Sequence, residues 1–481
     1  MRRTRHQVHG SLMAVGLVTM MAIGPASAAP DPVAQDSNAD LAAYLSDVAA
    51  DQDIPGMAAT VVTPEGTEFE WMSGEDGNGK RVTRDTPFLI GSLAKSMTAT
   101  LVLHRVEAGT IQLSDPIGER LPWLVDGRPT VEQLLTHTSG YSTADGLAVA
   151  ERFDNTSGAI RRAAADLDHS GTRDQYEYSD ANYLILGALV EHVDGRPFGD
   201  VLRTDLLQPL GMNDTASTSE AAADLPAGHR YWWGSPRSYS PGFDESGTPF
   251  GYVSSTLDDL IRYARAQNGS NPDVLNPELL REVHAPRVDS GDDEYGFGWR
   301  ITPSAVGPLI NHTGATPGYF AHVTLGPDDQ AVLVLANAYS EARAPALAAV
   351  AENMLLILDG RSPESSSNNP LLTALPWVLT VLALVGLAMG IMAWWRPVRR
   401  GLRWTLAAVA VLIAIAVWLL PGLFGTNLHV MSIWMPDAAV ALTIALVTWA
   451  AAVAFLLLPR SAYTRVASTV SRSRTGSLPS S

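Results

Sequence analysis

Two residues three positions apart give the first indication of chemistry in this chain. Ser92 and Lys95 stand in the segment Gly91-Ser92-Leu93-Ala94-Lys95. If Ser92 opens a helix, both side chains lie on one face of that helix. A serine hydroxyl is a good nucleophile only when a neighbouring group removes its proton, and a lysine can do so when burial or nearby cations lower its pKa. The spacing therefore predicts a serine nucleophile activated by Lys95.

Lysine is scarce in this chain, which strengthens that prediction. Among 33 basic residues only Lys80 and Lys95 are lysine. A codon bias toward arginine explains the scarcity, but arginine cannot release its proton near neutral pH and lysine can. The presence of lysine at position 95 therefore favours a role in proton transfer. The chain has no cysteine, which excludes thiol nucleophiles, disulfides and thiolate metal sites.

Further segments extend the pattern, and together they resemble a known family. After the S-x-x-K segment come Tyr178-Ser179-Asp180 and His312-Thr313-Gly314. This order is similar to that of the penicillin-binding and class C β-lactamase-related serine hydrolases. The resemblance runs from about residue 40 to 358 and includes three more segments, which are Gly109 to Pro116, Leu134 to Gly140 and Tyr295 to Trp299.

The resemblance implies roles for the matching positions. It implies that Ser92 is the acylated nucleophile and that Lys95 and Tyr178 share the proton transfer, with Tyr178 as base toward Ser92 and as acid toward the leaving group. The backbone N–H groups of Ser92 and Ala315 are then expected to form the oxyanion hole. The expected substrate-binding residues are Asp180, His312, Thr313 and Gly314.

Two of these positions depart from the family's usual pattern. Position 180 holds Asp where Asn is usual, and position 312 holds His in place of Lys. We expect His312 to be mostly neutral at pH 7, because the ordinary pKa of histidine is about 6.5, and to gain a proton below that pH. A neutral His312 and an anionic Asp180 predict a pocket that disfavours anionic β-lactams and suits a neutral ester or a peptide amine that pairs with Asp180.

The elements that must position these residues follow an α/β pattern. A helix is expected from Leu41 to Val48, and another follows Ser92 from Leu93 to Ala108. Strands are expected near both ends of the region, and the residues between about 97 and 290 read as helical with long loops. We therefore expect an antiparallel sheet flanked by helices, with an inserted all-helical subdomain. The expected strands are Met57 to Val62, Thr67 to Met72, Phe320 to Leu325 and Ala331 to Ala336.

The rest of the chain reads as targeting and anchoring sequence. Residues 1–28 have the basic start, short apolar run and small-residue cleavage site of a signal peptide, and the hydrolase domain is then expected over 29–360. A polar linker, 361–370, precedes a three-span transmembrane anchor over 371–458. Each apolar run of this anchor reaches the length of about 20 residues that is needed to cross a bilayer. Residues 459–481 are the expected cytoplasmic tail.

The arginines predict the orientation of the anchor. Arginines flank the loop after the first span and occupy the tail, whereas the loop before the third span holds Asp437 and no basic side chain. The positive-inside rule then places the first loop and the C-terminus in the cytoplasm and the hydrolase domain outside the plasma membrane. The spans are expected to act as an anchor rather than a transporter.

Charge and residue content narrow the function. Counted from the sequence, residues 29–360 carry a net charge of −27 within a chain total of −17, which argues against nucleic-acid binding. Neither a cofactor nor a metal is expected. An EF-hand-like run from Asp166 to Glu177 has Arg173 where an apolar residue should pack. The leading hypothesis is a serine hydrolase acting on a small peptide, ester or cell-wall substrate, as a D-Ala peptidase or esterase. The alternatives are a β-lactamase and a non-catalytic receptor or sensor.

Overall fold

The computed structural model describes residues 37–395, 398–423 and 425–457. The expected signal peptide and the expected cytoplasmic tail lie outside these residues.

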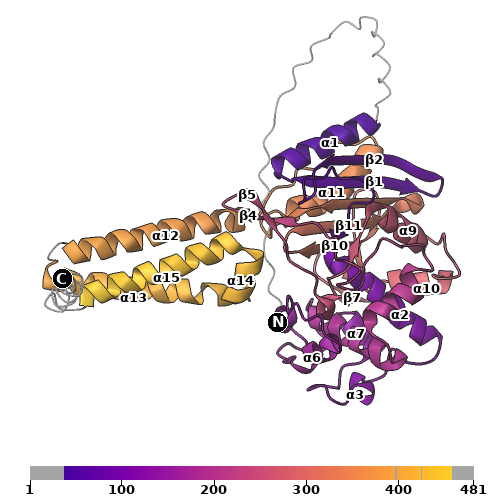
Figure 1. The fold of residues 1–481 in the computed structure, drawn as a ribbon, viewed down its shortest axis with the longest axis horizontal. Coiled ribbons are helices and arrows are strands. Elements are labelled where there is room, and N and C mark those ends of the chain that lie inside the picture. Colours follow the sequence, from indigo (N-terminus) through magenta and orange to yellow (C-terminus); the bar gives the residue numbers. More distant parts are fainter. Residues whose placement is uncertain (1–36, 396–397, 424, 458–481) are drawn as a thin grey trace, which may run out of the picture. The chain divides into compact units, whose positions relative to one another are not determined.

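An antiparallel sheet of eight strands supports residues 37–358, which we call the globular region (Figure 1). Its strand order is β2-β1-β12-β11-β10-β9-β8-β7, so the N-terminal hairpin pairs with a strand that lies far along the chain. Met57 is opposite Ala336 in this pairing. The sheet confirms the antiparallel arrangement expected from the sequence. Its strands are β1 (Gly56–Thr63), β2 (Gly66–Gly74), β7 (Val288–Asp289), β8 (Glu294–Tyr295), β9 (Arg300–Thr302), β10 (Leu309–Thr316), β11 (Tyr319–Leu325) and β12 (Ala331–Ala336).

The two faces of the sheet pack against different helices. Helices α1 (Ser37–Asp51) and α11 (Ala344–Leu358) share a buried cluster with Met57 and Ala59 of β1. Side chains alternate between the faces of a strand, and Ala58 accordingly belongs to the cluster on the opposite face. This alternation places the sheet between two helical layers. One layer is made by the two ends of residues 37–358, and the other is made by the middle of that range.

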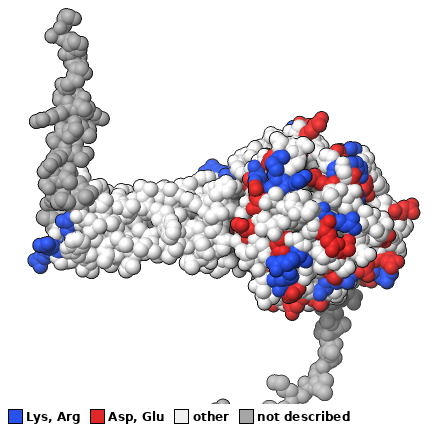
Figure 2. All heavy atoms as spheres, turned by 90° about the horizontal axis from the view of Figure 1, so that it is seen from below, with Lys and Arg blue, Asp and Glu red and all other residues white. Residues whose placement is uncertain are grey.

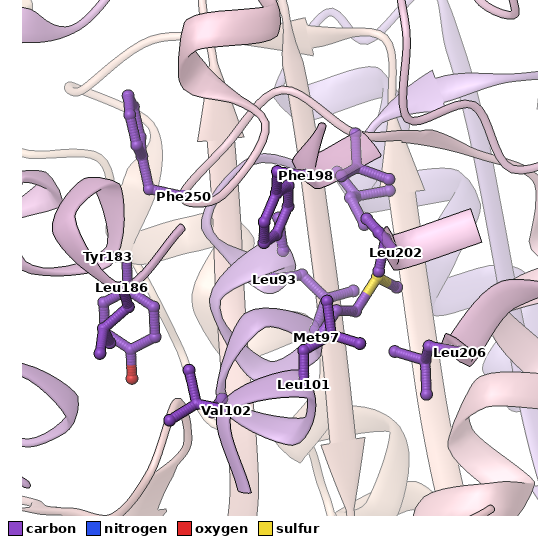
Figure 3. Packing of buried hydrophobic residues seen from close by; sticks show 14 of the residues in the cluster. Leu93, Met97, Leu101, Val102, Tyr183, Leu186, Phe198, Leu202, Leu206 and Phe250 are labelled. Atoms are coloured by element: carbon purple, nitrogen blue, oxygen red, sulfur yellow. The ribbon is translucent and has the colours of Figure 1, made fainter. Parts of the chain in front are cut away.

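The helical region contains the helix that follows Ser92. Helix α2 (Ala94–Glu107) is buried along most of its length, and its buried residues include polar ones such as Lys95 and Ser96 as well as apolar ones. Figure 3 shows Met97 and Leu101 packed in a cluster with Phe198 and Leu202. The other α-helices of the globular region are α3 (Ile117–Arg120), α4 (Val131–Leu135), α5 (Thr143–Val149), α6 (Ala159–Ala165), α7 (Asp180–Asp194), α8 (Phe198–Leu202), α9 (Leu257–Gln267) and α10 (Pro277–His284).

Two small sheets were not expected from the sequence. Strands β4 (Gly228–Trp232) and β5 (Ser235–Tyr239) form a hairpin, and β13 (Ala338–Tyr339) pairs with β4. Trp233 and Gly234 connect the hairpin and both have positive φ, 46° and 88°. Two positive φ values in a two-residue loop are typical of the turns that join twisted strands. The second sheet consists of β3 (Phe88–Leu89) and β6 (Ser254–Ser255).

Three long apolar helices follow the globular region. Helices α12 (Pro370–Trp395), α13 (Arg400–Leu423) and α15 (Pro436–Leu457) are long and apolar enough to cross a membrane. The face of these helices seen in Figure 2 is almost entirely uncharged, and basic residues gather at the end where α13 begins. A short helix that the sequence did not predict, α14 (Leu428–Trp434), lies between α13 and α15.

Candidate active site

Ser92 and Lys95 lie next to each other, as their spacing predicts. Ser92 sits in a single 3₁₀ turn, η1 (Gly91–Leu93), directly before α2. The Nζ atom of Lys95 donates to Ser92 Oγ at 2.9 Å and to the Phe250 backbone oxygen at 2.8 Å. The Lys95 side chain is 0 % exposed. This geometry lets a proton pass directly between the serine hydroxyl and the lysine amine.

The backbone around Ser92 approaches β10 so closely that only glycine fits at two positions. Gly91 has a φ of +52°, and a Cβ there would lie 2.3 Å from the backbone nitrogen of Ala315. A Cβ on Gly314 would lie 1.8 Å from the Ile90 oxygen. The two glycines therefore bring the backbone N–H of Ala315 beside the turn that carries Ser92. Two N–H groups in such an arrangement can hold an oxyanion.

Tyr178 faces this pair from the segment that leads into α7. Its ring centroid lies 4.9 Å from Lys95 Nζ, and Thr143 Oγ1 donates to the Tyr178 backbone oxygen at 2.7 Å. Burial and the nearby Asp180 carboxylate raise the pKa of Tyr178 well above its usual value, although a hydrogen bond with Ser92 opposes this. Burial lowers the pKa of Lys95, against the opposing effect of Asp180. These two pKa directions favour Lys95 as the base toward Ser92, whereas the family resemblance implied that Tyr178 has this role.

The Asp180 carboxylate contacts Lys95. Its Oδ1 atom lies 2.6 Å from Lys95 Nζ, and this oxygen has no other hydrogen-bond partner among the described residues. An acid already engaged in an ion pair is a poor partner for a second cation. The expectation that Asp180 pairs with a substrate amine is therefore not favoured, although Asp180 does line the cavity in front of Ser92.

His312 occupies β10 and is 2 % exposed. Its Nδ1 donates to the Thr313 backbone oxygen at 2.6 Å, which leaves Nε2 to accept from the Tyr295 hydroxyl at 3.3 Å. Burial, together with Arg300 and Lys95, holds the pKa of His312 well below its usual value. The expectation that His312 gains a proton just below about pH 6.5 is therefore wrong. Thr313 lines the same cavity.

His137 lies where it can position Tyr178. It is buried with a φ of +57°, and its Nδ1 accepts from the Ser179 backbone N–H at 3.2 Å. Its ring centroid lies 4.4 Å from that of Tyr178. Its Nε2 then donates to the Tyr295 hydroxyl at 3.3 Å. A chain of hydrogen bonds thus runs from the Ser179 backbone, next to Tyr178, through His137 and the Tyr295 hydroxyl to His312.

Arg300 was missed in the sequence and is the one guanidinium among the described residues that line the cavity. Its guanidinium carbon lies 5.6 Å from the Tyr178 ring centroid. The available signal was its place directly after the Tyr295 to Trp299 segment. Because a guanidinium stays charged at all ordinary pH, the cavity has a fixed cation that the charge argument from Asp180 and His312 left out.

Together these residues border one cavity. Its volume is about 530 Å³, within the range of small-molecule sites. Of the residues predicted from the sequence, it is lined by Ser92, Tyr178, Asp180, His312, Thr313 and Ala315. Lys95 lies beneath Ser92, and Gly314 acts through the close approach of β10 rather than as part of the lining.

Sequence comparisons relate this chain to a known family. The profile of the Beta-lactamase family matches residues 41–353. Penicillin-binding protein 4 of Amycolatopsis lactamdurans is 31% identical over 307 residues, which cover 59% of this chain and 80% of that protein. Protein flp of Staphylococcus aureus strain N315 is 24% identical over 271 residues, which cover 53% of this chain and about half, 54%, of that protein.

Solved structures share the fold. A penicillin-binding protein homologue from Pyrococcus abyssi, described as octameric, has a TM-score of 0.60 at 22% identity and covers 71% of this chain and 81% of its own. D-alanine carboxypeptidase AmpC from Burkholderia cenocepacia has a TM-score of 0.53 at 24% identity, with coverage of 63% and 94%. A class C β-lactamase has a TM-score of 0.57 at 19% identity, with coverage of 66% and 95%.

Proposed function

Because the chain belongs to the Beta-lactamase family of serine hydrolases, we propose that it hydrolyses an amide or ester through an acyl intermediate on Ser92. The observation that carries the proposal is the 2.9 Å contact between Ser92 Oγ and the buried Nζ of Lys95. We further propose that the enzyme is exported and held in the plasma membrane by α12, α13 and α15, with its catalytic domain outside the cell and its C-terminus in the cytoplasm.

In the acylation step, Ser92 Oγ attacks the substrate carbonyl carbon and its proton passes to Lys95. The oxyanion accepts hydrogen bonds from the backbone N–H groups of Ser92 and Ala315. The leaving group departs with a proton from Tyr178, which regains one from Lys95. Water then attacks the acyl-serine, and the products are the free acid and the restored Ser92 hydroxyl.

The substrate class we favour is a cell-wall peptide that ends in D-Ala, or an ester of similar shape. Arg300 supports this choice because its guanidinium lines the cavity and can pair with a terminal carboxylate. One structural relative is described as a D-alanine carboxypeptidase. A β-lactamase remains the runner-up, since a β-lactam also carries a carboxylate beside its reactive amide.

The alternative from another functional class is a receptor that binds a ligand without turnover. A binding site has no need of a buried lysine beside a half-buried serine hydroxyl that lines the cavity. A fluorophosphonate probe separates the two, because only an activated serine is phosphonylated. We expect one mass adduct on the detergent-purified full chain, none on Ser92→Ala, and an unchanged adduct on Ser73→Ala, which removes an exposed hydroxyl from β2. Absence of any adduct on the wild-type chain would favour the receptor.

A further inference from the structure

The cavity in front of Ser92 has a polar side and an apolar side. The polar side carries the catalytic groups and Arg300. The apolar side comes from the start of α12 and from the segment around α14. The residues it contributes are Leu372, Leu375, Val430, Met431, Trp434 and Met435.

Polar contacts hold this apolar wall against the catalytic domain. The Trp233 backbone N–H donates to Asp437 Oδ2 at 2.8 Å, and Trp233 Nε1 donates to Thr380 Oγ1 at 3.0 Å. Arg230 Nη1 donates to the Ile433 backbone oxygen at 2.7 Å. The hairpin β4–β5 thus forms hydrogen bonds with α12, α15 and the end of α14. These bonds fix the apolar wall in place beside the cavity.

The wall continues directly into the surface of the long apolar helices. Leu375 is buried beside the cavity, whereas Trp377 and Val381, less than two turns further along α12, are 55% and 59% exposed. Exposed apolar surface of this extent is typical of a protein face that meets lipid. The apolar wall of the cavity thus lies within two helical turns of a helix surface suited to lipid.

The acids at this end of the cavity do not oppose such a chain. Glu151 lines the cavity, and burial raises its pKa to about 8. Burial also raises the pKa of Glu341, another lining residue, against a hydrogen bond with Tyr339. Around neutral pH Glu151 is therefore mostly an uncharged carboxylic acid.

We propose that the cavity binds a membrane-resident amphiphile, with its ester or amide carbonyl at Ser92 and its hydrocarbon chain against the apolar wall. This inference rests on the proposed acyl-Ser92 chemistry and goes beyond the D-Ala peptide favoured above, because it gives the substrate a hydrocarbon chain. Burial of each additional methylene against the wall stabilises the bound state, so the rate should rise with chain length.

The test compares p-nitrophenyl decanoate with p-nitrophenyl acetate, using the full chain in one detergent. We expect kcat/KM for decanoate to exceed that for acetate by about tenfold or more. The wall variant Val430→Thr, Met431→Gln keeps the approximate side-chain shapes but makes the wall polar. It should lower the decanoate-to-acetate ratio about fivefold or more, because the loss of apolar contact falls on the longer chain.

The matched control is Leu428→Gln, which makes the same kind of change on α14 at a residue outside the cavity lining. It should keep the wild-type ratio, and because all variants share one detergent, partition of the substrate into micelles affects them equally. A wild-type ratio near one, or a wall variant that keeps the full ratio, overturns the amphiphile proposal while leaving the acyl-serine chemistry intact. Acetate turnover that is equal in wild type and Ser92→Ala overturns the proposed chemistry itself.

Discussion

Asp180 lies 2.6 Å from Lys95 across the floor of the active site, and its carboxylate opposes the effect of burial on the pKa of that lysine. Burial lowers the pKa of Lys95, and the Asp180 carboxylate raises it. Replacing the acid by a neutral amide of the same size should therefore let the lysine lose its proton at lower pH. Position 180 thus controls the pH range in which Lys95 can accept a proton from Ser92.

We predict that Asp180→Asn moves the acidic limb of the pH–kcat/KM profile to lower pH. The sign follows because a lower Lys95 pKa leaves more of the amine neutral at a given acidic pH. His137 and His312 should not produce this limb, since burial holds the pKa of each well below its usual value. The measurement is hydrolysis of a neutral ester across the acidic range. An acidic limb that stays in place would show that Lys95 is not the titrating base.

The two glycines at the oxyanion site give a second prediction. In Gly91→Ala the new Cβ meets the backbone nitrogen of Ala315 at 2.3 Å, and the residue must also keep a positive φ. The turn should move away from β10, and kcat should fall about 100-fold or more, as when an oxyanion donor is lost. Single-turnover acylation measures this, with circular dichroism to verify the fold.

Gly66→Ala is the matched control for that variant. It makes the same change at the start of β2, where a Cβ meets no atom within 4 Å. We expect its acylation rate to equal that of wild type. If Gly91→Ala is acylated within about threefold of the wild-type rate, the backbone approach does not form the oxyanion site.

The sequence predicted the local elements well and the contacts between distant segments poorly. Strand β12 was predicted with the bounds that it has, because its apolar run ends at polar residues on both sides. The S-x-x-K spacing also placed Lys95 correctly beside Ser92. Arg300 and the hairpin β4–β5 were missed, because their roles depend on packing against segments remote in the chain. The hydrophobic periodicity of a short stretch of sequence does not indicate such packing.

Arg300 provides a third prediction, which concerns substrate charge. If its guanidinium pairs with a substrate carboxylate, Arg300→Gln should lower kcat/KM for a peptide ending in D-Ala about tenfold or more, which corresponds to ~1.4 kcal/mol. Hydrolysis of a neutral ester should change by less than about threefold. Arg287→Gln removes an arginine that lies over the Phe297 ring and does not line the cavity, and it should affect neither substrate. Equal losses on both substrates would assign Arg300 to support of Tyr178 instead.

The last prediction concerns the orientation of the anchor, and the absence of cysteine makes it simple to test. Single-cysteine variants Ser366→Cys and Ser477→Cys place one thiol before α12 and one near the C-terminus of a chain that otherwise has none. The described loop between α12 and α13 carries Arg399, and α13 begins with Arg400 and Arg403, whereas the loop before α15 has no basic side chain among its described residues apart from His429. Arginine-rich loops stay in the cytoplasm. A membrane-impermeant maleimide should therefore label Ser366→Cys in intact cells and Ser477→Cys only after permeabilisation.

Labelling of Ser477→Cys in intact cells would mean that an even number of helices crosses the membrane or that the catalytic domain faces the cytoplasm, and the Ser366→Cys result distinguishes these two cases.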